Sequence, residues 1–120
     1  MRAIIVDDEL NARLALKGIL EENFPEINVV AENADVPSAV KSIHSFHPEL
    51  VFLDIAMPGY SGLELLNFFD VNTINFKIIF VTAYTEYAIN AFELSAVDYI
   101  LKPVRIDALQ RALSKIKETK

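Results

Sequence analysis

The sequence predicts an α/β domain in which helices cover both faces of a five-stranded parallel sheet. Three observations support this fold class. Five short apolar runs alternate with five segments of helical periodicity, every run is apolar on both faces, and the segments between the runs fit right-handed crossovers. The chain has 120 residues, of which 52% are hydrophobic and 23% charged, so it can bury one core and leaves little room for a second domain.

Each expected strand is a short apolar run, and the first is rich in β-branched residues, as is typical of strands buried on both faces. The second run follows Pro25, which closes the first helix, and the third leads into the turn-forming pair Pro58-Gly59. The expected strands span residues 3–6, 27–31, 50–53, 77–81 and 97–101.

The expected helices place their apolar residues along one face. The third helix should open at Ser61-Gly62, and in the fourth we expect Ala88, Ala91 and Phe92 to point inward. The other helices are expected to span residues 9–23, 36–46 and 106–117, and the fourth residues 85–94.

Composition argues against several classes of function. A net charge of -6 disfavours a nucleic-acid-binding face, which would have to be basic. The chain has no cysteine, so it has no disulfide, thiolate metal site or thiol nucleophile. The apolar run near the N-terminus is too short for a signal peptide or a membrane span, so we expect a cytoplasmic protein.

Polar side chains follow four of the five expected strands. Asp7 and Asp8 follow the first, Asp54 the third, Thr82 the fourth and Lys102 the fifth. Taken singly, each has an ordinary interpretation as a capping residue or a solvated charge. Because the C-terminal ends of parallel strands meet at one edge, the set should lie together.

Three carboxylates at one edge repel one another and call for a cation, and carboxylate oxygens suit Mg²⁺. A lysine and a hydroxyl beside them suit the oxygens of a phosphoryl group. The central residue, Asp54, is then the expected nucleophile, which would form an acyl phosphate.

Four motifs together resemble the receiver domains of two-component response regulators. They are IIVDDE at residues 4–9, LDIAMPG at 53–59, VTA at 81–83 and DYILKP at 98–103. The resemblance covers essentially the whole chain, so it implies one receiver domain over residues 1–120. It also implies a flavodoxin-like (βα)5 three-layer sandwich with the strand order 2-1-3-4-5.

The resemblance assigns a role to each residue at the predicted edge. It implies that Asp54 is the phosphoacceptor and that Lys102 pairs with the phosphoryl group. It implies that Asp8, Asp54 and the backbone carbonyl of Ala56 bind Mg²⁺ directly, with Asp7 acting largely through a bound water. The resemblance also implies a cis peptide bond between Lys102 and the proline that follows.

Thr82 and Tyr99 match the switch pair of the family. Phosphorylation of Asp54 would draw the Thr82 hydroxyl inward, and the Tyr99 ring would turn from exposed to buried. The surface of the fourth helix, fifth strand and fifth helix would then change, and that surface is the expected face of a homodimer. The implied phosphodonor is a sensor histidine kinase, and the domain would catalyse its own phosphotransfer and dephosphorylation without being a turnover enzyme.

A narrower resemblance lies in residues 80–93 and 96–99, which are similar to receivers of the LytTR (LytR/AlgR-type) subfamily. Full-length members carry a C-terminal LytTR DNA-binding domain that controls transcription, and this chain contains none of it. We therefore expect a receiver taken from a longer transcription regulator, or a stand-alone receiver.

Three other functions remain open at the level of the sequence. A phosphatase of the haloacid-dehalogenase type would carry Asp-x-Asp after its first strand, where this chain has Asp-Asp-Glu. A flavodoxin-like FMN carrier would need hydroxyls in the first loop, and a degenerate receiver would act only as a binding module. If the chain is a receiver, Ala56 offers no side-chain hydrogen bond to the water that hydrolyses the phosphoryl group, and the bulky Tyr84 could partly cover the site. Both should therefore alter the lifetime of the phosphorylated form.

Overall fold

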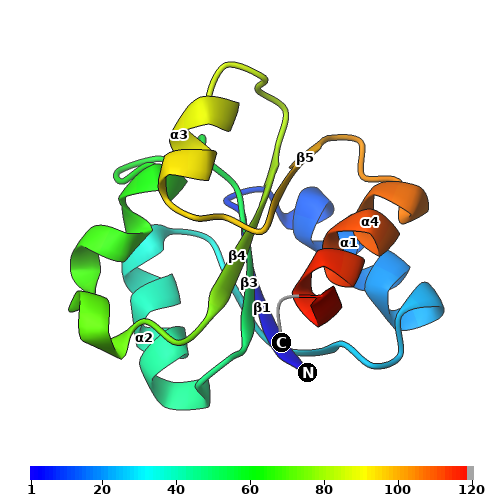
Figure 1. Ribbon diagram of the computed structural model, residues 1–120, viewed down its shortest axis with the longest axis horizontal. Coiled ribbons are helices and arrows are strands. Elements are labelled where there is room, and N and C mark those ends of the chain that lie inside the picture. Colours follow the sequence, from blue (N-terminus) through cyan, green and yellow to red (C-terminus); the bar gives the residue numbers. More distant parts are fainter. Residues whose placement is uncertain (119–120) are drawn as a thin grey trace.

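Five parallel strands form the central layer of the computed structural model, which describes residues 1–118 (Figure 1). Their order is β2-β1-β3-β4-β5, which confirms the predicted topology. The strands are β1 (Arg2–Val6), β2 (Asn28–Asn33), β3 (Leu50–Leu53), β4 (Lys77–Thr82) and β5 (Asp98–Leu101).

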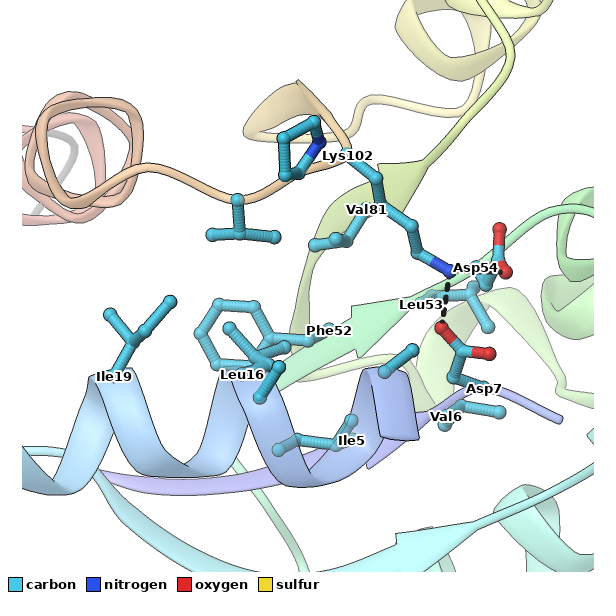
Figure 2. A pocket seen from close by; sticks show the side chains of 14 residues that line it. Ile5, Val6, Asp7, Leu16, Ile19, Phe52, Leu53, Asp54, Val81 and Lys102 are labelled. Carbon is cyan, nitrogen blue, oxygen red and sulfur yellow. Dashed lines mark hydrogen bonds and ion pairs between the residues drawn. The ribbon is translucent and has the colours of Figure 1, made fainter. Parts of the chain in front are cut away.

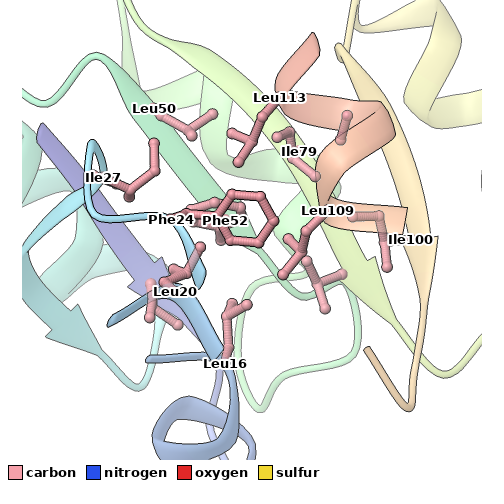
Figure 3. Packing of buried hydrophobic residues seen from close by; sticks show 14 of the residues in the cluster. Leu16, Leu20, Phe24, Ile27, Leu50, Phe52, Ile79, Ile100, Leu109 and Leu113 are labelled. Atoms are coloured by element: carbon pink, nitrogen blue, oxygen red, sulfur yellow. The ribbon is translucent and has the colours of Figure 1, made fainter. Parts of the chain in front are cut away.

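Helices pack on both faces of this sheet and make two cores. On one face lie α1 (Leu10–Asn23) and α4 (Ile106–Glu118), and on the other lie α2 (Val36–Phe46), α3 (Ala88–Glu93) and the 3-10 helices η1 (Gly62–Phe68) and η2 (Val71–Thr73) (Figure 1). Successive strand residues face opposite sides, so Ile5 joins the first core and Ile4 the second. Phe52 lies in the middle of the first core, against residues of α1 and α4 (Figure 3).

The element expected to open at residue 61 is a 3-10 helix rather than an α-helix. Ser61 and Glu64 form a reciprocal capping box at its start. Its end is set by extended backbone at Phe69 and by Asp70, whose side chain accepts from the amide of Asn72 and caps η2 instead. Asp side chains compete in this way with helix continuation.

The fourth predicted helix is shorter than expected, and one prediction about its packing is wrong. The helix α3 covers only Ala88–Glu93, and Phe92 is 63% exposed instead of inward. Successive helical residues are about 100° apart, so a short helix that buries Ala91 against the sheet turns its neighbour toward solvent. The remaining elements begin and end within two residues of the prediction.

No helix among residues 1–118 is long and apolar enough to cross a bilayer. The peptide bond between Lys102 and Pro103 is cis, as the resemblance implied.

Candidate metal and phosphoryl site

The register of β1 and β3 brings two aspartates side by side at the C-terminal edge of the sheet. Val6 lies opposite Leu53, so the residues that follow them, Asp7 and Asp54, emerge next to each other. The amide of Asp54 donates to the carbonyl of Val6 at 2.9 Å. Each of these two aspartates is only 5% exposed. Burial of this kind requires partners for both carboxylates.

Backbone amides hold one oxygen of each buried carboxylate. The amide of Glu9 donates to Asp7 Oδ1 at 2.9 Å, and the amide of Ile55 donates to Asp54 Oδ1 at 2.7 Å. Asp8 is exposed, and among residues 1–118 no hydrogen bond or ion pair reaches its carboxylate. Carboxylate oxygens of Asp7, Asp8 and Asp54 all lie within 4.8 Å of one another, as the sequence predicted.

Lys102 supplies positive charge to this acidic cluster from the end of β5. Its Nζ lies 2.6 Å from Asp7 Oδ2 and 3.1 Å from Asp54 Oδ2 (Figure 2). Burial lowers the pKa of Lys102, but the hydrogen bonds that its ammonium donates to Asp7 and Asp54 outweigh burial and hold that pKa above its usual value. The lysine is therefore charged at neutral pH and neutralises part of the cluster.

The donor set at this edge fits Mg²⁺. Three carboxylates converge there, one of them is exposed and free to take a new partner, and hard oxygen ligands are what Mg²⁺ prefers. No histidine or cysteine belongs to the cluster among the described residues, so a zinc site is disfavoured. Ala56 lies in the exposed loop two residues beyond Asp54, next to the same edge.

Gly62 fixes the backbone of Asp54 from the other side, and the sequence analysis missed this role. A Cβ at Gly62 would lie 2.0 Å from the carbonyl oxygen of Asp54, so no larger residue fits without displacing backbone. The amide of Gly62 donates to the carbonyl of Ile55 at 3.0 Å. The pair Ser61-Gly62 is typical of a helix start, but no feature of the sequence predicts the contact of Gly62 with Asp54 at the end of β3.

Thr82 and Tyr99 are connected through the backbone of Tyr84. Thr82 is fully buried at the end of β4, and its Oγ1 accepts from the amide of Tyr84 at 3.4 Å. The Tyr99 hydroxyl donates to the carbonyl of Tyr84, and the Tyr99 ring is half-buried. Burial raises the pKa of Tyr99, so its hydroxyl stays protonated and remains a donor.

Asp98, the first residue of β5 and the one before Tyr99, is buried and forms ion pairs within the chain. It lies 2.8 Å from Arg111 Nε and 3.2 Å from Lys115 Nζ, and it accepts from the amide of Tyr99 at 2.8 Å. Burial raises the pKa of Asp98, but the bonds from Arg111, Tyr99 and Lys115 outweigh it and hold the pKa below its usual value. This carboxylate ties β5 to α4.

An apolar cavity of about 210 Å³ opens beside the acidic cluster. It lies between α1 and the loop of Pro103 and Val104, and Phe52 forms part of its floor (Figure 2). Lys102 closes the end of the cavity that faces the two buried aspartates.

Comparison with known proteins agrees with this geometry. Residues 3–114 match the family described as the response regulator receiver domain. The transcriptional regulatory protein BtsR of Salmonella typhi is 40% identical over 98% of the chain, which covers 48% of that protein. The chain thus spans about half the length of the curated relatives it matches.

Two solved structures show how closely the fold is shared. The response regulator TrrA of Thermotoga maritima, in complex with Mg(2+)-BeF, superposes with a TM-score of 0.82 at 34% identity, over 96% of this chain and 97% of that one. A DNA-binding response regulator of the LuxR family from Staphylococcus aureus gives 0.84 at 29% identity, over 96% and 97%. The narrower resemblance to LytTR-type receivers gains no support from these matches. The fold, the paired strand-end aspartates and the matched family together show that this chain belongs to the response regulator receiver domains of two-component systems.

Proposed function

We propose that this receiver domain accepts a phosphoryl group from a sensor histidine kinase on Asp54, with Mg²⁺ as its cofactor. The observation that carries the proposal is the position of Lys102, whose Nζ lies 2.6 Å from Asp7 and 3.1 Å from Asp54. From this position the Lys102 ammonium can pair with the oxygens of an incoming phosphoryl group, while Asp54, the proposed nucleophile, stays buried and oriented.

The proposed transfer uses the side chains as follows. A carboxylate oxygen of Asp54 forms a bond to phosphorus as the bond between phosphorus and the donor nitrogen breaks, and the electron pair of that bond leaves with the imidazole. Bound Mg²⁺ would neutralise charge on the phosphoryl oxygens, held by Asp8, Asp54 and the carbonyl of Ala56, with Asp7 acting through water. Lys102 moves from a carboxylate oxygen to a phosphoryl oxygen.

The proposed switch begins at Thr82. A phosphoryl oxygen on Asp54 would be a new charged acceptor for the Thr82 hydroxyl. Movement of that hydroxyl changes its contact with the amide of Tyr84, and the carbonyl of the same residue holds Tyr99. The surface made by α3, β5 and α4 would change in consequence, which corresponds to the fourth helix, fifth strand and fifth helix of the sequence prediction.

The output of this switch is also part of the proposal. The chain covers about half of its curated relatives, and BtsR is described as a transcriptional regulatory protein. We infer a regulatory domain that acts in the cytoplasm on a C-terminal DNA-binding domain, and that is not itself a turnover enzyme or a nucleic-acid-binding module. We propose a LytTR type for that output domain from the resemblance of residues 80–93 and 96–99. DNA-binding assays and a structure of the full-length protein would test it.

The phosphoacceptor is tested by incubating the domain with acetyl phosphate and Mg²⁺ and measuring the intact mass. We expect the mass to rise by one phosphoryl group, and we expect no rise with EDTA or in Asp54→Asn. The matched control is Asp107→Asn, which removes an exposed carboxylate of α4 and should label like wild type. Labelling of Asp54→Asn at the wild-type rate would refute the assignment.

A further inference from the structure

Arg13 reaches back from the first turn of α1 to the loop that carries the acidic cluster. Its Nη1 donates to the backbone carbonyl oxygen of Asp7 at 2.7 Å, and its side chain is only 16% exposed. That carbonyl belongs to the peptide bond between Asp7 and Asp8. The hydrogen bond therefore fixes the peptide plane from which Asp8 extends.

Glu32 on β2 holds the guanidinium in this position. Arg13 Nε lies 3.5 Å from Glu32 Oε1, and Lys17 Nζ lies 3.3 Å from Glu32 Oε2. Arg13 Nε is buried and has no hydrogen bond within the described part of the chain, so this contact is an ion pair only. The guanidinium is thus clamped between β2 and the acidic loop, and Glu32 offsets much of its charge.

The two aspartates of the loop differ in how they are held. Asp7 has partners at its amide, at both carboxylate oxygens and at its carbonyl. Asp8 has no side-chain partner among residues 1–118, so its orientation depends on the backbone that precedes it. Arg13 holds that backbone through the carbonyl of Asp7, beside the bond from the Glu9 amide to the Asp7 carboxylate.

We propose that Arg13 is a positioning residue that sets the affinity of the site for Mg²⁺ by fixing the peptide between Asp7 and Asp8. The inference rests on the proposed function, because it takes Asp8 as a direct ligand. Partners that orient metal ligands typically contribute a factor of 10 to 100 in affinity. We therefore expect Arg13→Met to weaken Mg²⁺ binding by about tenfold.

Simple electrostatics predicts the opposite sign. Removing a cation near a cation-binding site reduces repulsion and should tighten Mg²⁺ binding. The matched control is Lys17→Met, which removes a cation that pairs with the same Glu32 but does not touch Asp7. If Arg13 acts by position, Arg13→Met should weaken Mg²⁺ binding and Lys17→Met should not. If it acts by charge, both variants should tighten binding, Arg13→Met the more because it lies nearer the site.

The experiment measures the dissociation constant of Mg²⁺ by following the amide signal of Asp8 in two-dimensional NMR during titration. We expect about tenfold weaker binding in Arg13→Met, and binding equal to or slightly tighter than wild type in Lys17→Met. In Arg13→Met, labelling by acetyl phosphate should require a higher Mg²⁺ concentration to reach half of its maximal rate. At saturating Mg²⁺ the labelling rate should equal that of wild type. A purely structural defect would lower that saturating rate.

Arg13→Lys is a second variant that controls for a folding defect. It keeps the positive charge and removes the planar guanidinium group. We expect it to weaken Mg²⁺ binding severalfold with an unchanged thermal midpoint in EDTA. Wild-type affinity in both Arg13 variants, or tighter binding in Arg13→Met, would overturn the inference. Failure of the wild-type domain to bind Mg²⁺ at all would instead overturn the proposed function.

Discussion

At the scale of single residues, the site depends on groups that are held from two sides. Asp54 accepts from the amide of Ile55 and pairs with Lys102, while Gly62 packs against its carbonyl oxygen. The proposed nucleophile is therefore fixed by backbone as much as by charge. Close packing of this kind tolerates little change in volume.

Gly62→Ala should destabilise the domain because the new Cβ would lie 2.0 Å from the carbonyl oxygen of Asp54. We expect the free energy of unfolding to fall by about 2 to 3 kcal/mol, measured by urea denaturation. Gly18→Ala is the matched control, since a Cβ there meets nothing within 4 Å. Alanine in the middle of α1 should raise stability by up to about 1 kcal/mol. Equal stability of both variants would contradict the role given to Gly62.

Ala56→Asn should shorten the lifetime of the phosphorylated domain. The residue is exposed beside Asp54, and an amide there could orient the water that attacks the phosphoryl group. We expect dephosphorylation to become several times faster, timed by intact mass after removal of the donor. An unchanged rate would exclude any influence of this side chain.

At the scale of elements, the carboxylate of Asp98 joins β5 to α4. Three donors converge on it, from Arg111, Lys115 and the amide of Tyr99. It therefore sets the position of the strand that carries Tyr99 against the helix that forms one side of the proposed output surface. The same carboxylate is not free to bridge to a partner molecule.

Asp98→Asn should lose a contribution to stability that depends on pH. Because the pKa of Asp98 is lowered on folding, the contribution is present above its ordinary value of 3.8 and is lost as pH falls through the folded value. We expect the variant to be less stable by about 1 to 3 kcal/mol at pH 7, with a smaller difference near pH 3, in urea denaturation. Asp107→Asn, at a site that is 78% exposed, should change stability by less than about 0.5 kcal/mol. A difference that stays constant with pH would contradict the pairing.

At the scale of the whole molecule, the sheet order collects residues from four strands at one edge. It also leaves apolar side chains uncovered around α3 and β5, where Ile89 is 74%, Phe92 63% and Leu101 43% exposed. Exposed large apolar side chains that lie together mark candidate interaction surfaces. This is the surface that the proposed switch would alter.

Phosphorylation should therefore favour a homodimer through α3, β5 and α4. We expect acetyl phosphate and Mg²⁺ to shift the wild-type domain toward dimer in sedimentation velocity, and we expect Phe92→Glu to abolish the shift without preventing phosphorylation. Val71→Glu, a substitution of a 77% exposed residue on η2, is the control and should dimerise normally. A phosphorylated wild-type domain that stays monomeric would rule out this dimer.

The sequence predicts the strand-end cluster well because register and strand direction leave few alternatives. Asp7, Asp54 and Lys102 meet as predicted, since parallel strands in this order end at one edge. Close packing within the segment that follows β3 was not predictable, and Gly62 against the carbonyl oxygen of Asp54 is one example. The outward position of Phe92 was missed because periodicity does not report how short α3 is, and a short helix that buries Ala91 turns Phe92 toward solvent.

The connection between Thr82 and Tyr99 runs through the amide and the carbonyl of Tyr84, and neither group belongs to a side chain. A substitution at position 84 therefore leaves the connection in place, provided that the new residue keeps its backbone amide. The Tyr84 side chain is 46% exposed, and its ring contacts the ring of Tyr87 edge-on. In the proposed switch, a change of side chain at this position would alter the cover over the phosphoryl group and leave the backbone route from Thr82 to Tyr99 in place, so the lifetime of the phosphorylated form and the transmission of the signal would be separable by mutation.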